Sequence, residues 1–150
     1  MSRIRRILHA TDFSRASSAA FTKALDLAKT NKAELLVVHT LAPGMPMVGD
    51  GYVSPQVYED LAASARAYGK KNLDALVAKA KKAGVRAKSL LLEGVPHEQI
   101  ARTARRQRAD VVVMGTHGRT GLAKLFLGSV AGRVIAIAPC PVLTVRKPDE

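Results

Sequence analysis

This chain of 150 residues has a single cysteine, no tryptophan and only six aromatic residues, three Tyr and three Phe. One cysteine, Cys140, excludes an internal disulfide framework and cannot by itself form a zinc site with cysteine ligands. So few aromatic side chains offer little surface on which nucleic-acid bases can stack. The four histidines show no close metal-ligand spacing, so we expect no structural metal site.

Long apolar runs are also absent. No segment reaches the ~18 uncharged apolar residues that a membrane-spanning helix needs. The basic N-terminal residues lead to Asp12 without the sustained apolar stretch of a signal peptide. We therefore expect a soluble cytoplasmic protein with no membrane partner.

Acidic residues are scarce, with 12 Asp+Glu against 24 Lys+Arg and a formal net charge of +12. This excess favours an anionic partner, such as a phosphate group, a nucleic acid or an acidic surface, but it does not determine the fold. Arg102, Arg105, Arg106 and Arg108 resemble a stripe for nucleic acid, yet a charge run on a helix is usually its solvated face. Nucleic acid is therefore not the partner that we expect.

Apolar runs of strand length alternate along the chain with longer segments of helical period. The predicted strands lie at residues 4–12, 35–40, 85–92, 110–114 and 141–145, and the predicted helices at 14–28, 55–83, 96–107 and 129–138. This order predicts an α/β fold, namely one doubly wound, mainly parallel five-stranded sheet with helices on both faces, in a single domain over residues 1–150. Residues 41–56, rich in Gly and Pro, are predicted to form a long functional or mobile loop.

The candidate site follows from this topology, because open parallel sheets bind ligands beyond the carboxyl ends of their strands, where the winding reverses. If strand 4–12 lies beside strand 110–114, Asp12 and Gly115 face each other across one crevice. Glycines after strand 110–114 let backbone N–H groups approach a ligand. The helix that begins near Ser129 attracts an anion to its N-terminus. Arg119 and Lys124 add positive charge, so this segment is interpreted as a phosphate cradle.

The spacing of this segment is neither that of a dinucleotide-binding fingerprint nor that of a P-loop. Gly115, Gly118, Gly128 and Ser129 instead form the pattern G-x2-G-x9-G-S. With this pattern, the segments Ile7–Ser14, Val111–Gly121 and Ala138–Leu143 make the chain resemble the UspA-like universal stress protein family. The resemblance spans the whole chain, with residues 41–56 the least characteristic part. It implies a Rossmann-like fold of the adenine nucleotide alpha hydrolase-like type and, as ligand, ATP or a related adenine nucleotide (ADP or AMP), with Mg²⁺ accompanying it.

The resemblance also implies roles for individual residues. Asp12 is expected to approach the adenosine, the main chain of Thr40 to meet the adenine edge, and Met114 to line the base pocket. Phosphates and ribose are expected on backbone amides, helped by the Ser129 hydroxyl and the charge of Arg119; the residues concerned are Gly115, Gly118, Gly128, Ser129 and Val130.

Ordinary structural roles compete with these assignments. Asp12 and Ser129 are both common helix N-caps. His9 and His39 are expected to be core histidines with satisfied hydrogen bonds, His117 a solvated loop residue, and Cys140 a structural residue. Between Gly115 and Ser129 there is no Asp or Glu to hold Mg²⁺, so a dedicated ATPase or kinase is poorly supported.

We therefore predict a nucleotide-dependent stress-response protein that is not an efficient enzyme and has at most weak ATP hydrolysis. The segment 41–56 is expected to become ordered with nucleotide, and the apolar strand Val142–Val145 to pair with its mate in a homodimer. The alternative is an interaction protein whose basic face binds an acidic partner or nucleic acid.

Overall fold

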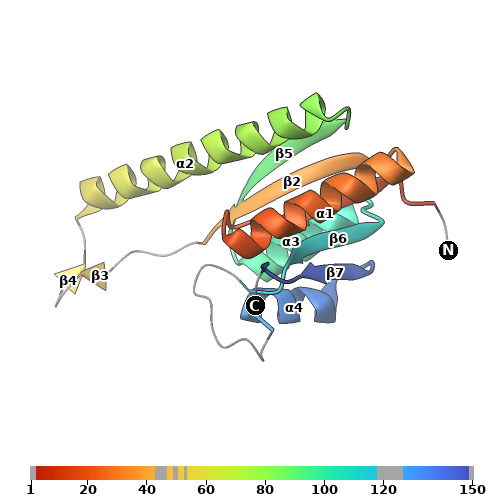
Figure 1. The fold of residues 1–150 in the computed structure, drawn as a ribbon. Coiled ribbons are helices and arrows are strands. Elements are labelled where there is room, and N and C mark those ends of the chain that lie inside the picture. The colour runs from red at the N-terminus through yellow and green to blue at the C-terminus, as the bar shows by residue number, and fades with distance from the viewer. Residues whose placement is uncertain (1–2, 43–46, 49–50, 53, 118–126, 149–150) are drawn as a thin grey trace.

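The computed structural model describes residues 3–42, 47–48, 51–52, 54–117 and 127–148 (Figure 1). Its main sheet has five strands in the order β5-β2-β1-β6-β7, and all of its neighbouring strands are parallel. The strands are β1 (Arg6–Ala10), β2 (Glu34–Leu41), β5 (Ala87–Glu93), β6 (Val111–Gly115) and β7 (Val142–Val145). The helices are α1 (Arg15–Asn31), α2 (Pro55–Lys82), α3 (Pro96–Arg106) and α4 (Ser129–Ile137).

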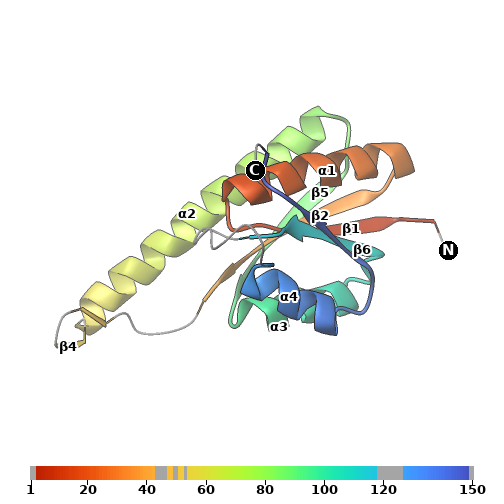
Figure 2. The same cartoon turned by 60° about the horizontal axis from the view of Figure 1, so that its bottom comes forward.

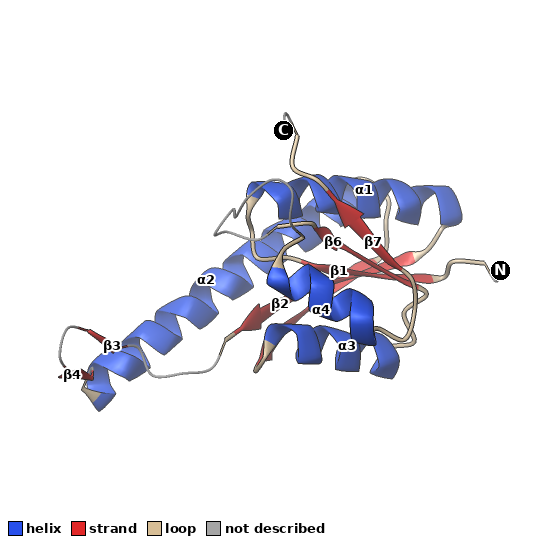
Figure 3. Ribbon diagram, turned by 90° about the horizontal axis from the view of Figure 1, so that it is seen from below, coloured by secondary structure: helices blue, strands red, loops and turns tan. Residues whose placement is uncertain are grey.

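The predicted fold class is confirmed, including the reversal of winding at the first strand. From β1 the chain winds outward through β2 to β5, and then returns to the other side of β1 for β6 and β7. Helices α1 and α2 cover one face of the sheet, and α3 and α4 cover the other (Figures 2 and 3). The crevice between β1 and β6 therefore lies where the sequence places Asp12 and Gly115.

Each central strand contributes side chains to two hydrophobic layers. Ile7, Val37 and Val113 pack in the layer with α1 and α2, whereas their neighbours Leu8 and Val38 pack in the layer with α3 and α4. Because successive strand residues point to opposite faces, a strand covered on both faces must be apolar at nearly every position. This explains the continuous apolar runs in the sequence.

The structure corrects two details around α2. Residues 41–56 are not one long loop, because Leu41 ends β2, α2 begins at Pro55, and Met47–Val48 (β3) pairs antiparallel with Gly51–Tyr52 (β4); the rest of that segment lies outside the described residues. The helical period of residues 55–83 also places Leu61 and Tyr68 on one apolar side of the predicted helix, yet these two residues are 50% and 48% exposed. The first half of the helix extends past the sheet (Figures 1 and 3), which leaves these side chains about half exposed, although the Tyr68 ring still meets the Phe13 ring edge-on with 5.8 Å between centroids.

His9 is a core histidine, as predicted, but only one of its ring nitrogens is satisfied. Nδ1 donates to the Val113 carbonyl oxygen at 3.0 Å, while the buried Nε2 has no partner among the described residues. The ring packs against Phe21 with 5.7 Å between centroids. Burial lowers the pKa of His9 to about 4, although the bond to Val113 and the charge of Asp12 act in the opposite direction.

This buried imidazole is expected to make the fold sensitive to acid. The folded-state pKa of about 4 lies below the ordinary 6.5, so between these values the unfolded chain binds more protons. The free energy of unfolding should therefore fall by about 3 kcal/mol as the pH drops through this window, and the His9 contribution should level off below it. Denaturant titrations across the window measure this loss.

The control separates His9 from carboxylates that titrate nearby. His9→Phe should remove the His9 share of the acid sensitivity, whereas His97→Gln, at the start of α3, should retain it. Equal pH dependence of wild type and His9→Phe would show that His9 is not the responsible group.

Candidate functional site

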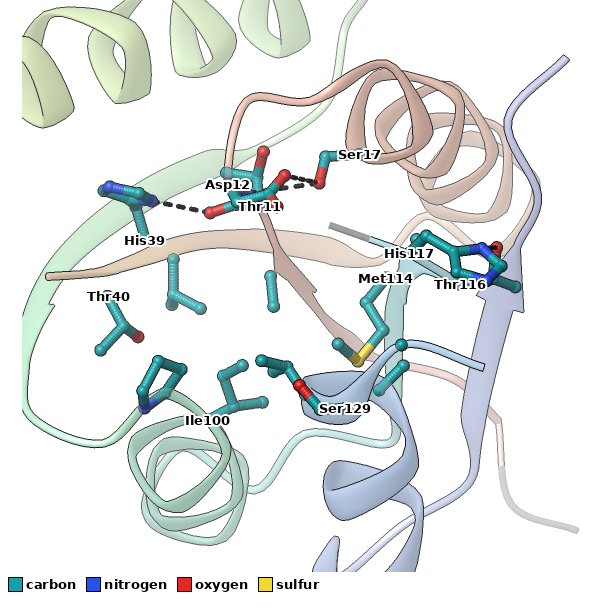
Figure 4. A pocket seen from close by; sticks show the side chains of 17 residues that line it. Thr11, Asp12, Ser17, His39, Thr40, Ile100, Met114, Thr116, His117 and Ser129 are labelled. Carbon is teal, nitrogen blue, oxygen red and sulfur yellow. Dashed lines mark hydrogen bonds between the residues drawn. The ribbon is translucent and has the colours of Figure 1, made fainter. Parts of the chain in front are cut away.

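A cavity of about 360 Å³ lies beyond the carboxyl ends of β1, β2 and β6 and is closed on one side by the first turns of α3 and α4 (Figure 4). Seven of the nine residues predicted to bind the ligand line it: Asp12, Thr40, Met114, Gly115, Gly128, Ser129 and Val130. Gly118 and Arg119, the other two, lie outside the described residues, as does Lys124. The structure therefore brings together at one site all of the predicted residues that it describes.

The cavity exists because β1 ends before the strands on either side of it. The last pairs of β1 are Ala10 with Val38 of β2 and His9 with Val113 of β6. Both neighbours continue further, β2 to Leu41 and β6 to Gly115. Backbone groups of these extensions that face β1 therefore have no strand opposite them.

On β2 these groups belong to Thr40. Leu35 N–H bonds to the Arg86 carbonyl and the Leu41 carbonyl accepts from Gly94 N–H, so odd-numbered residues face the β5 side. Even-numbered residues face β1, and the Val38 carbonyl takes the last bond there, from Thr11 N–H at 2.9 Å. The N–H and C=O of Thr40 come next on that side and have no ladder partner in the described part of the chain.

On β6 the same reasoning identifies Gly115. Val112 N–H bonds to the Pro141 carbonyl and Thr116 N–H to the Val145 carbonyl, so even-numbered residues face β7. The N–H and C=O of Gly115 accordingly face β1, one step past the last pair, His9 with Val113. The two open backbone edges, one on each side of the end of β1, border the same cavity.

The N-terminus of α4 supplies a third set of backbone donors. Its N-cap is Gly128, which has no side chain to cap the helix, and the first intrahelical bond runs from Gly132 N–H to the Gly128 carbonyl at 2.9 Å. The amides of Ser129, Val130 and Ala131 therefore lack intrahelical acceptors, and the helix dipole adds positive potential there. Ser129 is the first helical residue, so its hydroxyl is not used as an N-cap.

The structure revises the expected role of Gly128. Its N–H donates to the Thr116 carbonyl at 2.7 Å, so this amide is engaged within the protein. A Cβ at Gly128 would lie 2.8 Å from the Thr116 carbonyl oxygen, and a Cβ at Gly115 would lie 2.9 Å from the Ala16 Cβ. Both glycines thus permit close packing of the protein on itself.

Asp12 has a structural role in the turn between β1 and α1. Its Oδ1 accepts hydrogen bonds from Ser14 N–H at 2.9 Å and from the Ser17 hydroxyl at 2.8 Å. The N-cap of α1 is Ser14, whose side chain accepts from Ser17 N–H. Asp12 therefore supports the cap without being the cap itself, and it is the one acidic residue among the described residues that line the cavity.

Several cavity residues were not expected from the sequence. Pro96 and Ile100 form a wall from α3, and the signal for them was the position of that helix directly after the carboxyl end of β5. His39, predicted to be a core residue, is half-buried and lines the cavity, and its Nδ1 donates to the Thr11 carbonyl at 2.8 Å. His117 also lines it, with Nδ1 3.1 Å from the Thr116 hydroxyl.

In the part of the chain that the structure describes, the metal, thiol and membrane features give no second site. Among the described residues there is no group of three or more His, Cys, Asp or Glu side chains placed to hold a metal ion. Burial, reinforced by the charge of Asp110, raises the pKa of the Cys140 thiol, which disfavours a reactive thiolate. No helix in the described part of the chain is both long and apolar enough to span a membrane.

Comparison with known proteins agrees with the fold and with the family that the motif indicates. The model of the universal stress protein family matches residues 3–146. Universal stress protein MJ0531 of Methanocaldococcus jannaschii is 36% identical over 150 residues, an alignment that covers 97% of this chain and 84% of that protein.

Solved structures are similar over the same extent. A universal stress protein family member from Burkholderia pseudomallei has a TM-score of 0.76 and 31% identity, with 97% of this chain and 98% of that chain covered. The universal stress protein from Archaeoglobus fulgidus in complex with dAMP has a TM-score of 0.65 and 26% identity, with 96% and 99% covered. With its parallel sheet, its glycine pattern and a family model matched over nearly its full length, this chain belongs to the universal stress protein family.

Proposed function

We propose that this protein binds an adenine nucleotide, AMP, ADP or ATP, in the cavity at the end of β1 and acts as a nucleotide-dependent regulator in the stress response. The observation that carries the proposal is the meeting, in one cavity, of an open strand edge at Thr40 with three open helix amides at residues 129–131. The strand edge at Thr40 suits a nucleotide base, and the helix amides suit a phosphate group.

At the base end, Thr40 offers one donor and one acceptor side by side. Adenine carries a complementary pair on one edge, since N7 accepts a hydrogen bond and the 6-amino group donates one. Buried apolar side chains of Val38, Ile100 and Met114 line the same cavity and suit the faces of a planar ring. Asp12, beside this end, is proposed to contact the ribose.

At the phosphate end, the amides of Ser129, Val130 and Ala131 combine with the dipole of α4 to form an anion site. The Gly115 amide faces the cavity from β6, and the Ser129 hydroxyl adds a further donor. Gly118 and Arg119 belong to this end through the sequence motif. Mg²⁺ would enter with the phosphates, since Asp12 is the one carboxylate among the described lining residues.

Relatives support this choice of ligand. The Archaeoglobus fulgidus protein, which shares the fold and the family, holds dAMP, an adenine nucleotide. The surplus of 24 Lys+Arg over 12 Asp+Glu favours a negatively charged ligand as well. Binding without efficient turnover is the proposed activity, because phosphoryl transfer usually needs acidic ligands for Mg²⁺ around the phosphates.

The phosphate end is tested by Ser129→Pro. Proline fits the first position of a helix, and Gly128, with φ −61° and ψ 152°, already has the extended conformation that a residue before proline adopts. The variant lacks one amide donor and the hydroxyl while α4 is retained. We expect AMP and ATP binding, measured by calorimetry, to weaken about 10- to 100-fold, as for a lost hydrogen bond to a charged group.

The matched control is Ser129→Ala, which lacks the hydroxyl but keeps the amide and should bind more tightly than Ser129→Pro. For the wild type, AMP, ADP and ATP should raise the melting temperature, because they bind only the folded state. Equal affinity of Ser129→Pro and wild type would show that the phosphate lies elsewhere. No thermal shift with any of the three nucleotides would overturn the proposed function.

We also propose that two copies pair through β7, an edge strand of the main sheet. Pro141 and Val145 bond to β6, so the backbone groups of Val142 and Thr144 face outward, where a second strand can pair with them. Leu143 on β7 and Ile135 and Ile137 on α4 are exposed apolar residues close to this edge. A twofold interface over β7 would cover both the edge and these side chains.

Thr144→Pro tests this interface. It deletes an N–H that faces away from β6, so the bonds between β6 and β7 remain while pairing between copies is blocked. We expect a homodimer for the wild type and for the control Thr144→Val, and a folded monomer for Thr144→Pro, in light scattering after size exclusion. A Thr144→Pro dimer, or a wild-type monomer, would contradict this assembly.

One observation favours a second candidate function. Arg102, Arg105, Arg106 and Arg108 are exposed, and none of them forms an ion pair in the described part of the chain. This basic surface suits an acidic partner. The nucleotide thermal-shift measurement and a DNA-binding measurement at several salt concentrations together distinguish the two functions. Salt-sensitive DNA binding without any nucleotide-induced thermal shift would favour the second function.

A further inference from the structure

The Thr40 side chain contains a buried hydroxyl that the protein itself leaves without a partner. Its Oγ1 has no hydrogen bond within the described residues, although the atom is inaccessible to solvent. Thr40 lines the cavity, and Figure 4 shows its hydroxyl oxygen on the side of the residue that faces the other lining side chains. A buried hydroxyl without a partner is unfavourable, so a partner is expected from whatever fills the cavity.

The position of Thr40 on β2 explains why the hydroxyl has no partner. Side chains alternate along a strand, so Thr40 projects to the same face as Leu36 and Val38, which pack in the layer with α3 and α4. Pro96 and Ile100 line the cavity on that side, and neither side chain offers a hydrogen-bonding group. Valine would fill the same space at this position without a polar atom.

Other polar side chains around the base end already have partners. Asp12 and Ser17 bond to each other, and His39 Nδ1 bonds to the Thr11 carbonyl. The Thr11 hydroxyl accepts from Phe13 N–H. Among the side chains that the structure describes at this end, Thr40 Oγ1 is therefore a buried atom that a ligand can satisfy without breaking a bond within the protein.

We infer that the Thr40 hydroxyl is a specificity-determining group that recognises the 6-amino group of the base, an inference that rests on the proposed function. An exocyclic amino group has two hydrogens. The Thr40 carbonyl at the open strand edge accepts one, and the hydroxyl of the same residue, which has no partner among the described residues, accepts the other. The backbone pair alone would recognise the edge, and the hydroxyl adds preference for a 6-amino purine.

The experiment measures the coupling between the hydroxyl and the amino group. Wild type, Thr40→Val and Thr40→Ser are titrated calorimetrically with AMP and with purine riboside 5′-monophosphate, which lacks the amino group. Thr40→Val should weaken AMP binding roughly three- to tenfold, as for one lost hydrogen bond, and Thr40→Ser should restore it. Binding of purine riboside 5′-monophosphate should be equal in wild type and Thr40→Val.

A thermal measurement without ligand distinguishes recognition from a structural role. Because the hydroxyl has no partner within the protein, ligand-free Thr40→Val should melt at or above the wild-type temperature. If the variant melts lower, the hydroxyl stabilises the fold and the inference is overturned.

The outcomes separate this inference from the proposed function. If wild type binds AMP and Thr40→Val binds it equally well, or loses the same factor for both ligands, the hydroxyl does not recognise the amino group and only this inference fails. If wild type binds neither ligand, the proposed function fails and the inference falls with it. A loss confined to AMP and reversed by Thr40→Ser supports both.

Discussion

The central strand of the sheet is shorter at its carboxyl end than either neighbour, and the candidate site depends on this difference in length. Backbone N–H and C=O groups inside a protein need hydrogen-bond partners, and a parallel sheet normally supplies them from the adjacent strands. Where β1 ends at Ala10, β2 and β6 continue, and the backbone groups of Thr40 and Gly115 that face β1 have no ladder partner among the described residues. The fold thus provides a cavity with polar edges between apolar walls.

Close packing around the cavity keeps these groups in place. Gly115 lets α1 approach the end of β6 at Ala16, and Gly128 lets the start of α4 lie against the Thr116 carbonyl. Asp12, through Ser14 and Ser17, fixes the turn from β1 into α1. Residues that the motif associates with a ligand therefore also determine the shape of the cavity, so substituting them changes the local packing.

The two faces of the sheet differ in what they contribute. The layer with α1 and α2 is a packed core that also holds the His9 imidazole against Phe21, where burial lowers the pKa of that ring. The layer with α3 and α4 opens at one end into the cavity, where Met114, Ile100 and Thr40 line its wall. The cavity is thereby confined to one face and one end of the sheet, while the opposite layer is closed core.

The sequence alone determined the order of elements, the doubly wound parallel sheet and the region of the site around Asp12, Gly115 and Ser129. Hydrophobic periodicity, helix-forming segments and the glycine pattern were sufficient, because these features depend on local alternation and on how parallel strands connect. Only the tertiary structure decided which backbone groups lack a partner in the described part of the chain, that the Gly128 amide is already bonded to Thr116, and that the first half of α2 extends past the sheet with Leu61 and Tyr68 about half exposed. These properties depend on where separate strands and helices end relative to one another in space. A pattern within a single segment contains no information about the relative positions of those ends.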